Sequence, residues 1–216
     1  MKKLLGFSIF LVFVLIASLT AEAKVTLPAI FSDNMVLQQN TQVNVWGKAA
    51  PGEKVTVKAS WLDKPVTAKA AANGKWTVKL KTPKATTNQS VTVSGENEIT
   101  INNVLIGEVW LCTGQSNMEF PVSRHPDVKW NTGMLNEAEE LKDADYPEIR
   151  LFHVKHQLAH EGELDDCEGE WLVCNPKNLY DFSAVGFVFG RKLYKELKMP
   201  VGLIQSTWGG IHVESW

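Results

Sequence analysis

The stretch Gly114–Met118, which reads Gly-Gln-Ser-Asn-Met, holds the residues best suited by type and spacing to catalysis. It follows the apolar run Val104–Cys112, which is typical of a buried strand bounded by turn formers. The glycine lets the backbone turn sharply, and N–H groups around such a turn can face a developing oxyanion. A serine in such a turn is often only solvated, but the strand before it favours a nucleophile at Ser116.

The elements that must position this serine have the order expected of an α/β fold with a parallel sheet. Two further strands are predicted at Glu148–Val154 and Val201–Gln205, with a helix over Ser183–Leu197 between them. Either Asp181 or Ser183 suits the cap of that helix, and Pro200 follows its end.

A second glycine-rich strand end, Gly209-Gly210, follows the last of these strands. Active sites of parallel sheets lie at the carboxyl ends of the strands. We therefore expect Ser116 and one of the two glycines to lie at the same edge of the sheet. Gly186 and Gly190, one helical turn apart, predict that the helix packs closely on that sheet.

Residues 24–104 have a different pattern, because their apolar residues alternate with period two. Turn signals, the strongest of which is Asn73-Gly74, separate the segments and predict a small antiparallel sandwich with a hairpin at that dipeptide. The predicted strands are Gln42–Trp46, Lys54–Ala59, Lys75–Leu80, Ser90–Val93 and Glu98–Ile101.

The pattern of residues 1–23 predicts a signal peptide. Lys2-Lys3 precedes the apolar run Leu4–Leu19, and Ala21-Glu22-Ala23 fits a small-x-small cleavage site. The alternative is an uncleaved membrane anchor. We expect an exported protein, periplasmic or extracellular, that does not contact the membrane after cleavage.

Charge and cysteine content exclude several other classes of protein. A formal net charge of −2 gives no electrostatic reason to expect a nucleic-acid partner. No spacing of His and Cys resembles a metal site, so neither a metal nor another cofactor is expected. Cys112, Cys167 and Cys174 are too few for a disulfide framework, although Cys167 and Cys174 remain possible partners across a loop.

Several motifs taken together resemble the bacterial sialate O-acetylesterase family. They occur in a fixed order from about Leu27 to the end of the chain, and any one of them alone is a weak signal. The motifs are Phe31–Gln39, Val45–Gly47, Ala50–Val55, Gly107–Trp110 leading into Gly114–Glu119, and Pro200–Ile204 leading into Trp208–Gly210.

The resemblance implies a wider SGNH-hydrolase relationship and so a fold of two parts. These are a β-sandwich accessory domain at residues 24–104 and a partial α/β/α, flavodoxin-like SGNH catalytic domain at residues 105–216. It also implies that Ser116 attacks an acetyl ester on a sugar and that the Ser116 N–H joins the oxyanion site. The second donor is the N–H of Gly209 or of Gly210. Gln115 stands where the wider group has an aspartate and is expected to shape the turn.

The family also carries an oxyanion asparagine block and a C-terminal Asp-x-x-His pair, and this sequence has no match to either. His125, His153, His156, His160 and His212 are the local imidazoles, and each is expected to be a surface or structural residue rather than a substitute base.

We therefore expect the front portion of a serine esterase that hydrolyses O-acetyl groups on sugars, with little activity on its own. The sugar stays open: sialic acid, xylose or another acetylated unit. Two alternatives remain. One is a non-catalytic carbohydrate-binding module that uses exposed tryptophans such as Trp61 or Trp130, and the other is a structural exported β-domain.

Overall fold

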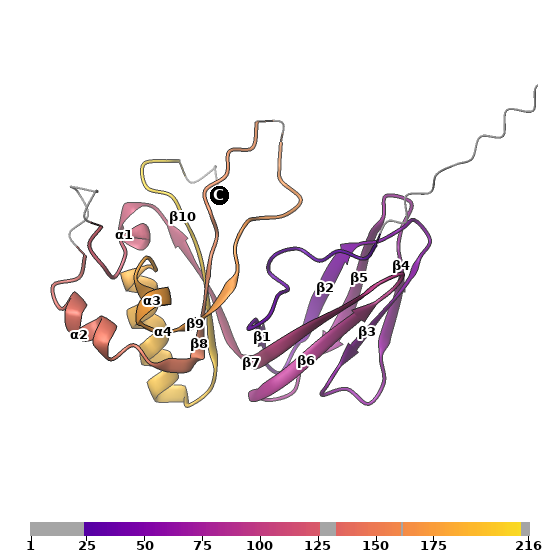
Figure 1. Cartoon of the computed structure of the whole chain (residues 1–216), viewed down its shortest axis with the longest axis horizontal. Coiled ribbons are helices and arrows are strands. Elements are labelled where there is room, and N and C mark those ends of the chain that lie inside the picture. Colours follow the sequence, from indigo (N-terminus) through magenta and orange to yellow (C-terminus); the bar gives the residue numbers. More distant parts are fainter. Residues whose placement is uncertain (1–23, 126–132, 161, 213–216) are drawn as a thin grey trace, which may run out of the picture.

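The computed structural model describes residues 24–125, 133–160 and 162–212 (Figure 1). The predicted signal peptide, residues 1–23, and Trp130 lie outside the described residues. Within the described ranges, no helix is long and apolar enough to cross a membrane.

The N-terminal part is built from short strands whose side chains alternate between core and solvent. In β5, Trp76, Val78 and Leu80 point inward, and Thr77 and Lys79 between them point outward. The alternating segments of the sequence are confirmed as strands. The strands of this part are β1 (Val36–Gln38), β2 (Gln42–Lys48), β3 (Lys54–Ala59), β4 (Val66–Lys69), β5 (Lys75–Lys81) and β6 (Thr86–Ser94).

The strand β7 (Glu98–Gly114) joins this part to the rest of the molecule. Its first half pairs antiparallel with β6, and residues 105–107 pair parallel with β1. Its second half pairs parallel with β10 (Val201–Thr207). From Trp110 to Gly114, the described residues provide only β10 as a neighbouring strand.

The C-terminal part adds strands and helices to the same sheet. β8 (Tyr146–His153) runs parallel to β10, and β9 (Trp171–Cys174) runs antiparallel to β8. The helices are α1 (Ser116–Glu119), α2 (Glu137–Lys142), α3 (Pro176–Leu179) and α4 (Ala184–Leu197). All four lie on one side of strands β8 to β10, and the N-terminal strands lie on the other side (Figure 1).

The prediction of a separate β-sandwich followed by a partial SGNH domain is wrong. The structure is a mostly sheet, mixed α/β fold with one sheet of eight strands in the order β4-β3-β6-β7-β10-β8-β9, to which β1 is added beside β7. A second sheet contains only β2 and β5. The boundary predicted between residues 104 and 105 falls inside β7.

The core explains why the two parts do not separate. Val55 and Val91 of the N-terminal strands share one cluster of buried side chains with Phe152 of β8 and Trp171 of β9. The sheet face opposite the helices therefore packs on the N-terminal strands instead of on a second helical layer. Separating the two parts would expose both surfaces to water.

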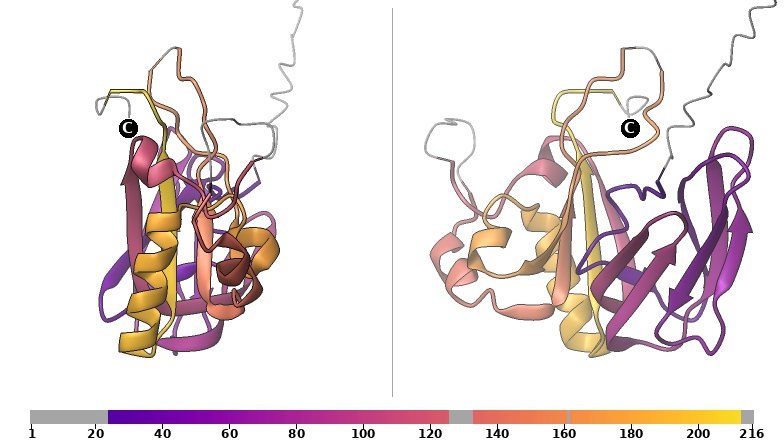
Figure 2. Two further views of the ribbon diagram at one scale, coloured as in Figure 1. Left: turned by 90° about the vertical axis from the view of Figure 1, so that its left-hand side faces the viewer. Right: turned by 45° about the vertical axis from the view of Figure 1, so that its right-hand side comes forward.

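The helix α4 begins and packs as the sequence predicts. Ser183, rather than Asp181, is its N-cap, because the Ser183 hydroxyl accepts a hydrogen bond from the Gly186 N–H at 3.0 Å. A β-carbon at Gly190 would lie 2.5 Å from Leu203 Cδ1 of β10, which confirms close packing on the sheet. Figure 2 shows this helix running alongside the strands.

One further expectation differs from the structure, and one open question is answered by it. Gly74 has a positive φ of 76°, but the turn at Asn73-Gly74 leads from β4 to β5 in different sheets rather than closing a hairpin between paired strands. All three cysteines are free, so Cys167 and Cys174 do not form a disulfide.

Candidate active site

Ser116 and Gly209 lie together at the carboxyl ends of two paired strands. β7 and β10 pair with each other in parallel. The last residues of this pairing are Gly114 and Thr207, where both strands end. Beyond that pair, the Trp208 N–H donates to the Gly114 carbonyl at 3.2 Å, so the two following loops stay side by side. The strand pairing therefore brings together two segments that are distant in the sequence.

The side of Gly209 on which a side chain would stand faces Ser116. A β-carbon at Gly209 would lie 3.1 Å from Ser116 Oγ and 3.5 Å from Ser116 Cα. At Gly210, a β-carbon would meet nothing within 4 Å. Gly209 is thus the member of the Gly209-Gly210 pair that adjoins the serine, and the serine itself is exposed.

Glu119 is the acidic residue of this cluster. It lies three residues after Ser116, one turn along α1, and its Oε2 accepts a hydrogen bond from the Gly209 N–H at 2.5 Å. Its Oε1 lies 3.2 Å from His156 Nε2. The Glu119 carboxylate therefore connects α1 to the loop after β10.

His156 is fixed by three neighbours. Its ring stacks on Trp208 with centroids 4.2 Å apart and planes 4° from parallel. Its Nε2 lies 2.7 Å from the Thr207 carbonyl oxygen. A carbonyl oxygen only accepts, so Nε2 carries the proton here and has no lone pair to take one from Ser116.

Among the described residues, the rings of the other candidate histidines His125 and His153 contact partners other than Ser116. His125 Nε2 pairs with Asp181 Oδ1 at 2.5 Å, and the His153 ring packs edge-on against Phe182. Burial lowers the pKa of His153, and the nearby His156 lowers it further. His160 and His212 are exposed in loops.

Gln115 and Gln205 hold the backbone around the site. Gln115 Nε2 donates to the Ile211 carbonyl at 2.6 Å, which ties the turn before Ser116 to the loop after Gly210. The buried Gln205 accepts from the Ser183 N–H at 2.7 Å and donates to Thr207 Oγ1 at 3.0 Å. The end of β10 is therefore anchored to the start of α4.

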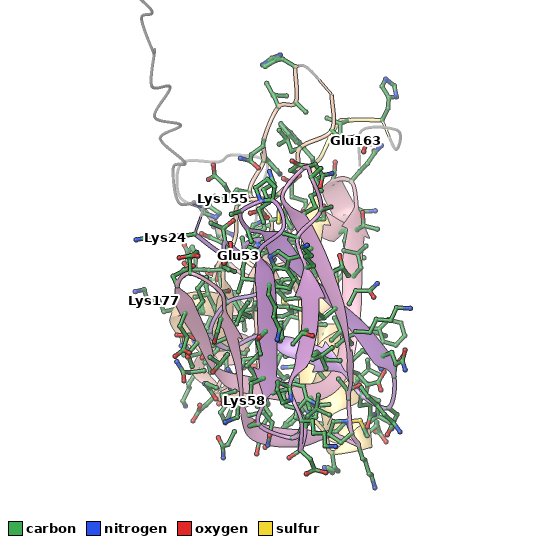
Figure 3. All side chains as sticks on the ribbon, turned by 90° about the vertical axis from the view of Figure 1, so that its right-hand side faces the viewer. Lys24, Glu53, Lys58, Lys155, Glu163 and Lys177 are labelled. Atoms are coloured by element: carbon green, nitrogen blue, oxygen red, sulfur yellow. The ribbon has the colours of Figure 1, made fainter. Side chains whose placement is uncertain are left out.

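A groove of about 780 Å³ opens beside this cluster. It is lined by His156, Trp208 and Ile211 and by the loop that follows β8, including Lys155 and Glu163. Figure 3 shows Lys155 and Glu163 toward the end of the molecule from which this loop projects, with Lys58 toward the opposite end. Aromatic, apolar and charged groups together suit a polar ligand with apolar faces.

Sequence reasoning missed two members of the cluster. Glu119 has a recognisable signal, because a residue three positions after Ser116 in a helix shares its face. His156 lies in an exposed loop, as expected, but that loop follows a strand that ends at the same sheet edge as β7 and β10. The parallel order of those strands was the signal that could have found it.

Comparison with known proteins gives a consistent result. Over 208 residues the chain is 34% identical to the sialate O-acetylesterase of Mus musculus, a match that covers 87% of this chain and 37% of the mouse protein. For the sialate O-acetylesterase of Homo sapiens, the identity is 33% over 204 residues, covering 86% of this chain and 37% of the human protein. No protein-family model matches the chain.

The structure resembles a solved carbohydrate acetylesterase from Xanthomonas citri. The TM-score is 0.78 at 32% sequence identity, and the match covers 89% of this chain and 42% of that chain. The fold is therefore that of carbohydrate acetylesterases. Within that class, the chain belongs to the sialate O-acetylesterase-like family, as its sequence motifs predict. It spans 37% of the length of the mouse relative.

Proposed function

We propose that this chain carries the nucleophile side of an O-acetylesterase site that acts on acetylated carbohydrates. The observation that carries the proposal is the contact of Gly209 with Ser116 at the ends of β7 and β10. The exposed Ser116 hydroxyl adjoins the Gly209 backbone, and relatives in this family are named for acetyl-ester hydrolysis.

In the proposed reaction, Ser116 Oγ attacks the carbonyl carbon of the acetyl ester and gives its proton to a general base. The tetrahedral intermediate then expels the sugar oxygen, which takes that proton, and water releases acetate from the serine. The Ser116 N–H and the Gly209 N–H are the proposed oxyanion donors. Gly210 is the poorer candidate because its open side does not face Ser116. Loss of one such donor reduces turnover by about 10²–10³-fold.

We place the general base outside the described residues. Among the described residues, no hydrogen bond joins either ring to Ser116, because His156 Nε2 lies on the Thr207 carbonyl and His125 Nε2 lies on Asp181. The asparagine and Asp-x-x-His blocks that the family resemblance implies have no match in this sequence. Because a serine without its base keeps little nucleophilic activation, the 216-residue chain should hydrolyse esters poorly.

We further propose that the protein is exported, as the pattern of residues 1–23 suggests, and that its substrate is an acetylated sugar. The groove supports a sugar substrate because its lining combines the apolar Trp208 and Ile211 with the charged Lys155 and Glu163. A purely carbohydrate-binding role predicts glycan binding without acetate release.

The test compares two forms of the protein with 4-nitrophenyl acetate and with O-acetylated sialic acid and xylan. A longer form that carries the asparagine and Asp-His blocks should release acetate, and Ser116→Ala should abolish that release. Ser94→Ala is the matched control, since Ser94 lies on β6 and bonds Glu98. Robust hydrolysis by the 216-residue chain that depends on a local histidine would contradict the placement of the base.

A further inference from the structure

Glu119 accepts a hydrogen bond from the Gly209 N–H, a donor that the proposed reaction needs. The Gly209 N–H can make one strong hydrogen bond, and Glu119 Oε2 accepts it at 2.5 Å. A β-carbon at Gly209 would lie 2.7 Å from this same Oε2 and 3.1 Å from Ser116 Oγ. The carboxylate oxygen and the serine hydroxyl therefore border the same small space, where an acyl oxygen would have to sit.

A carboxylate oxygen resembles an oxyanion in both charge and hydrogen bonding. Hydrogen bonds from N–H groups to ionised acceptors are shorter and stronger than those to neutral ones. The carboxylate of Glu119 can thus hold the Gly209 N–H in the orientation that an oxyanion requires. It also competes with the substrate for that N–H.

The second carboxylate oxygen of Glu119 already faces another donor. Its Oε1 lies 3.2 Å from His156 Nε2, and His156 is held by its stack on Trp208 and by the Thr207 carbonyl. Glu119 therefore has a second polar partner besides the Gly209 N–H.

We propose that Glu119 is a positioning residue that holds the Gly209 N–H in place of the oxyanion when the site is empty and passes it to the acyl oxygen when substrate binds. This inference rests on the proposed function. It assigns to Glu119 a role separate from nucleophile, base and oxyanion donor.

The test follows the backbone amide of Gly209 by ¹⁵N–¹H NMR in the 216-residue chain, with sodium acetate as the probe. Glu119→Gln should shift the Gly209 amide proton upfield, because a neutral acceptor replaces a charged one. Acetate should then bind about tenfold more tightly, the ratio expected when a charged hydrogen-bond acceptor gives way to a neutral one.

Asp181→Asn is the matched control for charge. Asp181 lies two residues before Ser183, the N-cap of α4, and its carboxylate bonds His125 rather than Gly209. Asp181→Asn should leave both the Gly209 amide and the acetate affinity unchanged.

Three results overturn the proposal. They are a Gly209 amide that does not move in Glu119→Gln, an acetate affinity that rises equally in Asp181→Asn, and acetate that leaves the Gly209 amide unmoved in every variant. Failure of the proposed function would appear separately, as absence of Ser116-dependent hydrolysis in the longer form with the Gly209 shift still present.

Discussion

Replacing Gly190 with alanine tests the packing of α4 on β10, which holds the end of β10 in register beside Ser116. A β-carbon at this position would lie 2.5 Å from Cδ1, 2.9 Å from Cδ2 and 3.0 Å from Cγ of Leu203. Leu203 is fully buried, so it cannot move aside into solvent. The new methyl group must therefore displace either the leucine or the helix.

Two opposing effects set the size of the change. In a helix interior, alanine is favoured over glycine by about 1 kcal/mol. Forcing a methyl group into a filled core costs about 1–3 kcal/mol. Because the overlap involves three atoms of one side chain, we expect overpacking to win, with a net loss of about 1 kcal/mol and a fall in Tm of about 2–4 °C.

Urea unfolding of Gly190→Ala, of Leu203→Ala and of the double variant measures these effects. With Leu203 truncated, the overlap disappears, and Gly190→Ala should then stabilise the protein by about 1 kcal/mol. Gly186→Ala is the comparison on the same helix: its β-carbon would lie 3.1 Å from Cys112 Sγ, a tight contact but a smaller overlap than the 2.5 Å approach to Leu203, so it should cost less than Gly190→Ala. If Gly190→Ala stabilises the chain equally with and without Leu203, the close-packing argument is refuted.

Three other outcomes are expected. The ion pair with Arg191 lowers the pKa of Glu140, so Glu140→Gln should lower the free energy of unfolding by about 3 kcal/mol at pH 7. A carboxyl group whose pKa is lowered by folding stabilises the fold at pH values above its pKa in the unfolded chain. The difference in the free energy of unfolding between the parent chain and Glu140→Gln should therefore vanish as the pH falls through the folded pKa of Glu140, and urea unfolding from pH 7 to pH 3 measures this. Burial raises the pKa of the Cys174 thiol to about 12. Iodoacetamide at pH 8 should therefore label the partly exposed Cys167 first and the buried Cys174 only in urea. Equal labelling of the two cysteines, measured by mass spectrometry, would contradict this expectation. Gly209→Ala keeps the backbone N–H but places a methyl group 2.7 Å from Glu119 Oε2 and 3.1 Å from Ser116 Oγ, so it should reduce acetyl-ester hydrolysis by the longer form while the far-UV circular dichroism stays unchanged.

The sequence predicts the individual elements better than their assembly. Alternation identifies strands such as β3 and β5 because each has one face in the core and one in water. β7 escapes this reasoning because its environment changes along its length, from one buried face near Ile99 to two around Leu105. Asn103, with φ of 53°, interrupts the alternation without ending the strand.

The candidate site shows the same division. Ser116 and the glycine pair are visible from local motifs and from the rule that active sites lie at the carboxyl ends of strands. Which of Gly209 and Gly210 adjoins Ser116 depends on the direction in which a side chain at each position would point. The path of the backbone after β10 sets that direction. The contacts of Glu119 and His156 join side chains that follow three different strands. A pattern within one segment of the sequence does not show which of these side chains meet.

The unpaired stretch of β7 has a consequence for handling the protein. From Trp110 to Gly114, the described residues pair the strand on one side only, with β10, and Trp110 and Leu111 are exposed. Such an edge is a template for aggregation. Concentrated samples of the 216-residue chain should therefore lose protein to β-rich aggregates, and a lysine at position 111 should slow that loss.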